Sequence, residues 1–242
     1  VLASRGIASV VMHQRGCSGE PNRMARFYHA GETDDLRVVL AHLRRTLPAR
    51  RILAVGYSLG GNILLKWLGQ APDPMLDAAA AVSVPFRLDD GARRLETGLS
   101  RIYQHYLLRA MKRSVARKRQ RMPHPVDPRA LAACRTFEQI DTTLTAALHG
   151  FRDAADYYAR SSCRQFLGSI RTPTLIIHSA DDPFMSPAAV PEEWELPARV
   201  RLELSQHGGH CGFVGGPFPL RPRYWLDERL AAFILSAIAQ TA

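Results

Sequence analysis

The fold is decided by residues 51–62, which read RILAVGYSLGGN. The stretch opens with a short apolar run, Ile52–Val55, that is typical of a buried strand, and Asn62–Leu68 after it has the pattern of a helix. Between the two lies a Gly-x-Ser-x-Gly turn that carries Ser58. A nucleophile elbow requires this strand–turn–helix passage, because its serine holds a strained backbone conformation among small neighbours. The alternative is a glycine-rich turn with no chemistry.

Further short apolar runs occur on both sides of this stretch. The five runs that we expect to be strands are Ile7–His13, Ile52–Val55, Ala78–Val84, Thr174–His178 and Val200–Leu204. They are rich in Val, Ile, Leu or Ala, and most lack the alternation of a half-exposed strand, which favours parallel strands covered on both faces. The expected helices around them are Asp34–Leu47, Asn62–Leu68 and Tyr224–Ile238. Strands that alternate with helices predict an α/β fold with a mostly parallel sheet and helices on both faces.

Residues 86–165 interrupt this alternation, because they contain no convincing strand. They are expected to form helices over Arg93–Arg119, Phe137–Leu148 and Asp153–Ser161. An ordinary connection between a strand and a helix is far shorter, so we interpret the interval as an inserted helical cap. The 242 residues suffice for one substantial core. We therefore expect a single domain over 1–242 with a cap insertion at about 86–165.

A serine nucleophile needs a base and an acid that orients the base, and both have candidates after the cap. Asp181 and Asp182 follow the fourth apolar run, and His207 and His210 lie in a glycine-rich loop after the last one. We favour Asp182, because the acid stands a few residues beyond its strand, and assign Asp181 to the turn. His210 is favoured because glycines flank it, and His207 is the candidate for capping the loop. The order Ser, Asp, His is that of α/β-hydrolases.

Positive charge is concentrated in one segment. The formal net charge is +10, and residues 87–121 hold eleven Lys or Arg against three acids. A nucleic-acid binder with an evenly basic surface would look different, and no nucleic acid is expected as a partner. Within 101–121 we expect one helical face to contain the apolar residues Ile102, Tyr106, Leu107 and Met111. That face either packs on the sheet or, with the basic residues, makes a peripheral contact with an anionic membrane.

The four cysteines, Cys17, Cys134, Cys163 and Cys211, form no Cys-x-x-Cys pair and no regular spacing. We therefore expect neither a disulfide framework nor a zinc site, and we expect a cytoplasmic setting. The first residue is Val1, so we expect a preceding segment that could carry a signal or an anchor.

The sequence resembles the YheT-like family of α/β-hydrolases, a group of esterases. The residues that carry this resemblance are His13–Glu20, Tyr28, Gly31, Thr33, Asp35, Gly56–Gly60, Asp141, Gly150–Phe151, Asp156–Tyr158, Ser162, Ile170, Pro173, Asp181–Asp182 and His207–His210. The resemblance implies a catalytic triad of Ser58, Asp182 and His210. It also implies an oxyanion hole that combines the Leu59 backbone N–H with an N–H from a His-Gly loop ahead of Val1. The resemblance further implies that the early N-terminal strands of the sheet precede Val1, which would leave an exposed sheet edge in residues 1–242.

These residues together predict a serine hydrolase that cleaves carboxylic esters of short-chain or lipid-like acyl groups through an acyl-enzyme. The substrate would be a small-molecule acyl ester, with no metal and no organic cofactor. One alternative is an acyltransferase that uses an alcohol acceptor, and another is a non-catalytic, membrane-associated protein of the same fold. With one oxyanion donor ahead of Val1, we expect residues 1–242 alone to be weakly active or inactive.

Overall fold

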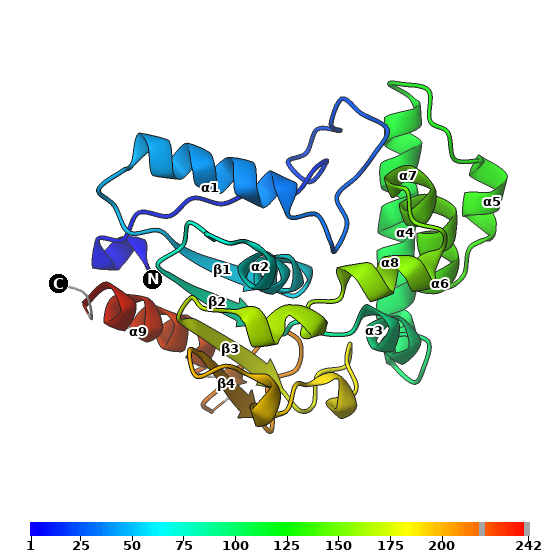
Figure 1. Cartoon of the computed structure of the whole chain (residues 1–242). Coiled ribbons are helices and arrows are strands. Elements are labelled where there is room, and N and C mark those ends of the chain that lie inside the picture. The colour runs from blue at the N-terminus through cyan, green and yellow to red at the C-terminus, as the bar shows by residue number, and fades with distance from the viewer. Residues whose placement is uncertain (218–220, 240–242) are drawn as a thin grey trace.

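A computed structural model describes residues 1–217 and 221–239 of the chain, and Figure 1 shows its layers. The main sheet has four strands, β1 (Leu53–Tyr57), β2 (Ala78–Val82), β3 (Thr174–Ser179) and β4 (Val200–Ser205), in the order β1-β2-β3-β4. Each strand is parallel to its neighbour. The expected parallel sheet is thus confirmed, and four of the five apolar runs form its strands.

The remaining run, Ile7–His13, is not a strand, which corrects the prediction made from its composition. Val10 and Val11 are 66% and 76% exposed. A strand needs hydrogen bonds from a neighbouring strand, and within 1–217 and 221–239 the ladder of β1 runs only to β2. Apolar composition alone therefore did not suffice to form a strand at this edge.

Successive residues of the strands face two separate cores, as the pleat of a sheet requires. One core holds Ala79, Ala81 and Ile176 and is covered by helices α1 (Asp34–Thr46) and α2 (Leu59–Gln70) with a short 3-10 helix, Arg164–Ser169. The other core holds Ala80, Val82, Leu175 and Ile177 and is covered by α9 (Trp225–Ala239). The central strands β2 and β3 are buried on both faces, which explains why they are mostly apolar, whereas the edge strand β4 carries Arg201 and Glu203.

Helices occupy most of the chain between β2 and β3, and we call residues 88–161 the cap. Its elements are α3 (Leu88–Arg94), α4 (Ser100–Arg119), α5 (Pro128–Ala133), α6 (Phe137–Ile140), a π-helical turn (Asp141–Ala146), α7 (Ala147–His149) and α8 (Ala154–Ser161). The predicted helix Arg93–Arg119 is two helices, because Gly98 between them has a positive φ of 53°. In Figure 1 the cap stands beside the sheet at the right. Whether it is an insertion in a single domain stays a prediction.

The buried face of α4 differs from the expected one. Ile102 and Tyr106 are 68% and 70% exposed, whereas Gln104, Leu108, Val115 and Lys118 are buried. Lys118 is buried because its Nζ donates hydrogen bonds to the carbonyls of Met24, Ala25 and Arg26, at 2.8, 3.2 and 2.8 Å. These bonds replace water around the ammonium group, so the helix turns a lysine inward and two large apolar side chains outward.

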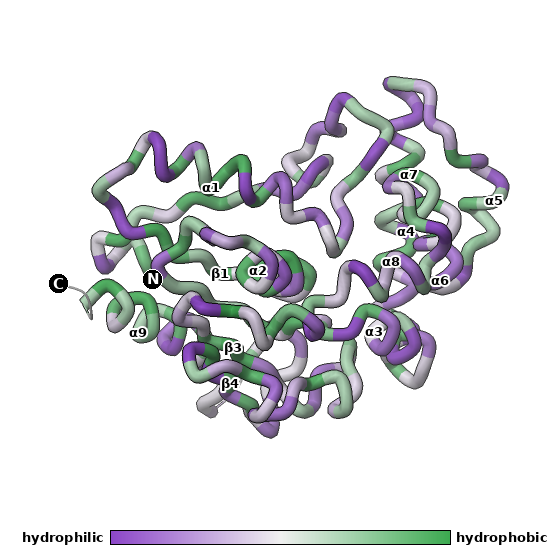
Figure 2. The backbone as a smooth tube through the Cα atoms, in the orientation of Figure 1, coloured by the Kyte–Doolittle hydropathy of each residue, from purple (hydrophilic) through white to green (hydrophobic). Residues whose placement is uncertain are grey.

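Smaller elements complete the described chain. They are 3-10 turns at Ala3–Arg5, Pro187–Ala189 and Glu193–Glu195, and an antiparallel pair of β5 (Val214–Gly215) with β6 (Arg223–Tyr224). Figure 2 shows the strands and α9 as mostly hydrophobic, while the cap mixes hydrophobic and hydrophilic residues along every helix. In the described residues, no helix combines the length and the apolar character that crossing a membrane would require.

Candidate active site

Ser58 stands at the point where β1 ends and α2 begins. Its φ of 49° and ψ of −121° lie in a strained region for a residue with a side chain. A Cβ on Gly56 would lie 2.6 Å from the carbonyl oxygen of Gly60, and one on Gly61 would lie 2.7 Å from Val84. Gly60 itself has no atom within 4 Å of such a Cβ. The tight turn therefore needs glycine at 56 and 61, and the motif's second glycine meets no such steric restriction.

The three side chains that the sequence predicted for the triad lie in contact. His210 Nε2 is 2.8 Å from Ser58 Oγ, and His210 Nδ1 is 2.9 and 3.1 Å from the two carboxylate oxygens of Asp182. Asp182 is only 4% exposed. With its proton on Nδ1, the imidazole donates to Asp182 and presents Nε2 as an acceptor to the serine hydroxyl. This arrangement can remove a proton from Ser58.

The structure separates the roles of the two neighbouring aspartates. Asp181 accepts hydrogen bonds from the backbone N–H groups of Gly208 and Gly209, at 2.9 and 2.8 Å, and from the hydroxyl of Ser179. His207, the other histidine considered, has a 91% exposed side chain that lies 3.4 Å from Asp181. Asp181 thus ties the histidine loop to the end of β3, while Asp182 contacts the imidazole.

Two further side chains hold the histidine loop, and no sequence pattern indicated them. Ser83, buried after β2 with a φ of 50°, accepts a hydrogen bond of 3.0 Å from the backbone N–H of Cys211. Phe184 stacks on the His210 ring at a centroid distance of 4.2 Å, and its N–H donates to Asp182 at 2.8 Å. Together they fix the position and the tilt of the imidazole.

Asn62, one turn into α2, ties the nucleophile helix to two distant segments. Its Nδ2 donates to the carbonyls of Ala30 and Ser161, both at 2.9 Å, and its Oδ1 accepts from the N–H of Cys163 at 2.9 Å. The residue is fully buried and uses all three bonds. Asn62 could have been noticed only as a polar residue in an apolar helix.

The electrostatics of His210 favour its protonated form. Burial by itself would lower the pKa of His210, but hydrogen bonds with Asp182 and Cys211 outweigh burial and raise it to about 9. The carboxylate therefore stabilises the imidazolium that forms when the ring accepts the serine proton. Leu59 is the first residue of α2, so its N–H lies at a helix N-terminus, where a developing negative charge is favoured.

One group of side chains within the described residues has the composition of a metal site. His29, Glu32 and His149 offer donor atoms that all lie within 4.8 Å of one another. The spacing of these residues in the sequence did not indicate this cluster. Burial, His149 and then Lys66 lower the pKa of His29 to about 3. The cationic side chains beside the cluster would repel a metal ion, so we assign it to packing between the cap and the first loop.

Comparisons with known proteins show the family of the chain. A family model described as the alpha/beta hydrolase fold matches residues 1–217. The chain is 46% identical over 229 residues to the protein of Escherichia coli named "Putative esterase YheT", with 93% of this chain and 67% of that protein covered. It is 31% identical over 236 residues to Phospholipase ABHD3 of Bos taurus, covering 96% of this chain and 57% of that protein.

The chain thus spans between about half and two thirds of the length of these relatives. Among solved structures, a hydrolase of the alpha/beta fold family from Bacillus anthracis superposes with a TM-score of 0.53. It is 13% identical, and the match covers 93% of this chain and 80% of that one. This likeness supports the fold alone.

Proposed function

The chain belongs to the α/β-hydrolase family and, within it, to the YheT-like group, and from this premise we propose that it is a serine hydrolase that cleaves carboxylic esters. Ser58 is the nucleophile, His210 the base and Asp182 the acid that orients it. The observation that carries the proposal is the 2.8 Å contact from Ser58 Oγ to His210 Nε2, with Asp182 on the other ring nitrogen. The esterase and phospholipase names of the relatives support the same class of reaction.

The reaction proceeds in two halves. As Ser58 Oγ attacks the ester carbonyl, its proton passes to His210 Nε2, and the Leu59 N–H stabilises the oxyanion. Collapse of the tetrahedral intermediate breaks the bond to the alkoxy oxygen, which leaves as an alcohol with the proton from His210. Water then attacks the acyl-enzyme and gives its proton to His210. Collapse of the second tetrahedral intermediate breaks the acyl bond to Ser58 Oγ, which takes the proton back from His210 as the carboxylic acid leaves. Asp182 keeps the ring in the productive tautomer in both halves.

The proposed substrates are esters with short-chain or lipid-like acyl groups. The relative named a phospholipase supports lipid-like esters, and the basic cap supports a peripheral contact with an anionic membrane through residues 101–121. All four cysteines are free, which is compatible with the cytoplasmic setting expected from the sequence. We further propose that residues 1–242 form one domain, with the cap as its insertion.

The test is covalent labelling of the full-length protein with a fluorophosphonate, followed by peptide mass analysis of the adduct. We expect label on Ser58 only and none in Ser58→Ala, with both proteins equally folded by circular dichroism. Labelled Ser58 would establish an activated nucleophile. Absence of label in the folded protein would contradict the proposal and favour the non-catalytic, membrane-associated alternative.

Acyl transfer to an alcohol uses the same triad and differs only in the acceptor. Incubating the enzyme with an ester and increasing concentrations of a short alcohol separates the two activities. A hydrolase yields mostly free acid at low alcohol concentration. A dominant transesterification product under those conditions would reassign the protein as an acyltransferase.

A further inference from the structure

The outer face of α4 changes character along the helix. Its N-terminal part exposes large apolar side chains, with Leu99 80%, Ile102 68% and Tyr106 70% exposed. Positions three and four apart share one side of a helix, so these residues form a continuous apolar strip that faces away from the buried Gln104 and Leu108. Packing within the described chain does not cover this strip.

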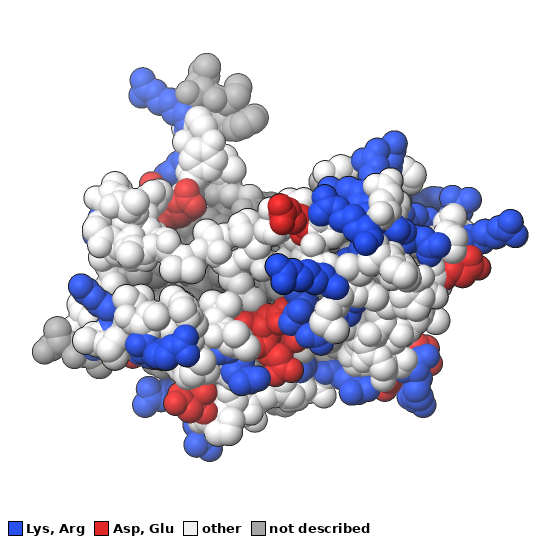
Figure 3. Space-filling view, turned by 90° about the horizontal axis from the view of Figure 1, so that it is seen from above, with Lys and Arg blue, Asp and Glu red and all other residues white. Residues whose placement is uncertain are grey.

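Arginines continue the same face toward the C-terminal end of α4. Arg109, Arg113 and Arg117 are exposed, and within residues 1–217 and 221–239 they form no ion pair with a carboxylate. Figure 3 shows Lys and Arg side chains gathered over the cap, at the right of the view from above. The outer face therefore places three unpaired cations beside an exposed apolar strip.

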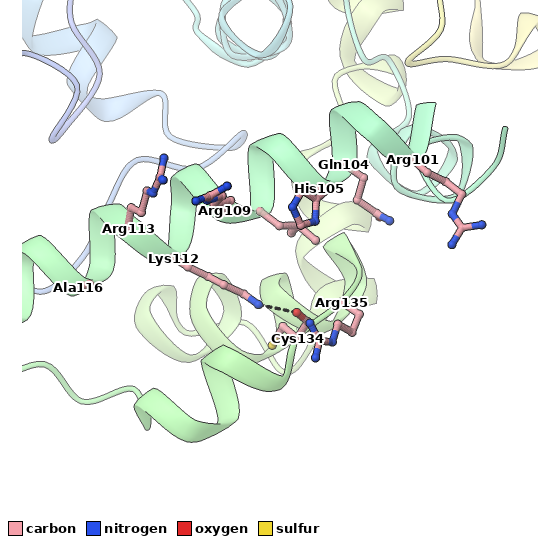
Figure 4. A pocket seen from close by; sticks show the side chains of 10 residues that line it. Arg101, Gln104, His105, Arg109, Lys112, Arg113, Ala116, Cys134 and Arg135 are labelled. Atoms are coloured by element: carbon pink, nitrogen blue, oxygen red, sulfur yellow. Dashed lines mark hydrogen bonds between the residues drawn. The ribbon is translucent and has the colours of Figure 1, made fainter. Parts of the chain in front are cut away.

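A basic groove runs alongside these arginines. It has a volume of about 730 Å³, and its lining includes the basic residues Arg101, Arg109, Lys112, Arg113 and Arg135. No acidic side chain is among the lining residues. Figure 4 shows the basic side chains along α4 and the bond from Lys112 to the Cys134 carbonyl, 2.6 Å long, which anchors Lys112 at the groove wall. A groove with this lining is suited to phosphate groups.

The apolar end of α4 is the end that adjoins the triad. Ser100 Oγ donates to the Pro183 carbonyl at 2.7 Å, directly after Asp182. Tyr103 packs on Phe184 at a centroid distance of 5.0 Å, and Phe184 stacks on His210 at 4.2 Å. A surface that covers the apolar strip would therefore lie next to the proposed active site.

We propose that the outer face of α4 docks on the surface of an anionic phospholipid bilayer. Leu99, Ile102 and Tyr106 enter the boundary between headgroups and acyl chains, and Arg109, Arg113 and Arg117 contact lipid phosphates. Charge complementarity selects this occupant, because a helix with an apolar strip and adjacent cations is suited to an anionic interface. A nucleic acid would use the arginines but not the apolar strip. The inference builds on the proposed function, in that docking brings acyl esters of the membrane to Ser58.

The experiment measures vesicle binding by the full-length protein carrying Ser58→Ala, so that the lipid is not consumed. We compare vesicles of phosphatidylcholine alone with vesicles containing phosphatidylserine. The test variant combines Arg109→Gln, Arg113→Gln and Arg117→Gln. The control combines Arg50→Gln, Arg171→Gln and Arg199→Gln, which removes the same charge from exposed positions outside the cap.

Binding is expected on the phosphatidylserine vesicles only. It should fall about 100-fold in the test variant, since each arginine near an anionic surface contributes roughly a factor of five, and less than about threefold in the control. Equal losses in the two variants would overturn the proposal, because they would reveal attraction by net charge alone. Absence of binding, or binding of an RNA oligonucleotide in place of vesicles, would overturn it as well.

Insertion of the apolar strip has a separate readout. In Ile102→Trp, tryptophan emission should shift to shorter wavelength on vesicle addition and be quenched by lipids brominated in the acyl chain, whereas Arg171→Trp should not respond. An unshifted Ile102→Trp spectrum in bound protein would contradict docking through this face. Neither assay depends on catalysis. If the protein docks on vesicles but native Ser58 takes no fluorophosphonate label, the esterase proposal is refuted and the docking proposal stands.

Discussion

The sheet at the centre of the body, by which we mean the described residues outside 88–161, and the cap bury different kinds of side chain. In the body, β2 and β3 pack between two apolar cores, and the side chains within those cores carry no charge. In the cap, Lys118 and Asp141 are 1% and 7% exposed and are held by hydrogen bonds to carbonyls or hydroxyls. The strands of the sheet are therefore specified by hydrophobic pattern, whereas the cap combines its apolar clusters with buried charged groups that need specific partners.

The titration of the cap's buried charges reflects this difference. Burial raises the pKa of Asp141 to about 6, against the lowering effect of hydrogen bonds from Thr145 and Tyr158. Burial, and then Arg15, lower the pKa of Lys118 to about 8. Both shifts favour the neutral form, so the cap carries its buried charges at a cost. In the body, Lys66 of α2 carries a similar cost, because burial lowers its pKa as well.

The largest expected effect separates adjacent residues of the body. Asp182→Asn should lower kcat for ester hydrolysis about 10,000-fold, because the amide no longer holds His210 in its productive tautomer. Asp181→Asn should lower it no more than about tenfold, since that side chain contacts only the loop backbone and neighbouring side chains. Steady-state kinetics on the two full-length variants measure both. If kcat fell more in Asp181→Asn than in Asp182→Asn, Asp181 would be the acid of the triad and Asp182 the residue that holds the loop.

Asp141 should make the stability of the cap depend on pH. Its folded-state pKa lies above the ordinary 3.8. The protonated carboxyl therefore contributes to the free energy of unfolding fully below pH 3.8, and this contribution is lost as pH rises through about 6. The difference between the two pKa values corresponds to about 3 kcal/mol. Urea unfolding from pH 4 to pH 7 should show this loss in the native protein relative to Asp141→Asn. Parallel pH profiles for the two proteins would show that Asp141 does not titrate in this range.

Lys118→Met should destabilise the cap by about 2 kcal/mol. Loss of the ammonium leaves three carbonyls without their donor and removes a cation that lies 3.7 Å from the Phe27 ring centroid. These losses are partly offset, because the variant no longer has to desolvate a charge when it folds. Hydrogen exchange should speed up in residues 24–27 and in α4 but not in β2 and β3. Arg117→Met, at an exposed neighbouring position, is the matched control. Faster exchange throughout the sheet would mean that cap and body unfold as one unit.

Gly56→Ala should destabilise the body by about 1–3 kcal/mol, because the new Cβ would lie 2.6 Å from a backbone oxygen. Gly60→Ala meets no atom within 4 Å and lies in α2, so it should be neutral or stabilising by up to about 1 kcal/mol. Thermal unfolding of the two variants gives the comparison. Equal losses would indicate that the elbow relaxes around either methyl group.

The pH dependence of the rate tests the electrostatics of His210. His210 acts as a base only when neutral, and its pKa is raised to about 9. The kcat/KM should therefore rise with pH through the range above 6.5 and level off near pH 9, a change of less than about tenfold for each pH unit. A plateau that begins below pH 6.5 would show that the carboxylate of Asp182 does not raise the imidazole pKa in solution.

The body could be predicted from the sequence because its apolar runs and its glycine-rich turn are local signals. Ile7–His13 has the same composition but forms no strand, since a strand depends on a neighbour that composition does not reveal. In the cap, the sequence suggested the helices but not the buried face of α4. Lys118 is buried by carbonyls more than ninety residues away in the chain, and no helical periodicity contains that information.

The candidate site shows the same limit. Ser58, Asp182 and His210 follow strand ends and could be named in advance, although their catalytic role stays a proposal. Ser83 and Phe184 lie far from His210 in the sequence and contact its loop only in the folded chain, so no local sequence pattern indicates their role.

The three hydrogen bonds of Asn62 restrict how a substrate could enter. They join the nucleophile helix to Ala30, to Ser161 at the end of α8 and to Cys163, where the cap returns to the body. A hinge motion that lifted the whole cap would have to break the buried bond to Ser161. Entry by local rearrangement of exposed side chains such as Tyr103, 46% exposed above Phe184, leaves this junction intact. The base of the cap is thus held in place, and substrate entry depends on the exposed side chains at the N-terminal end of α4.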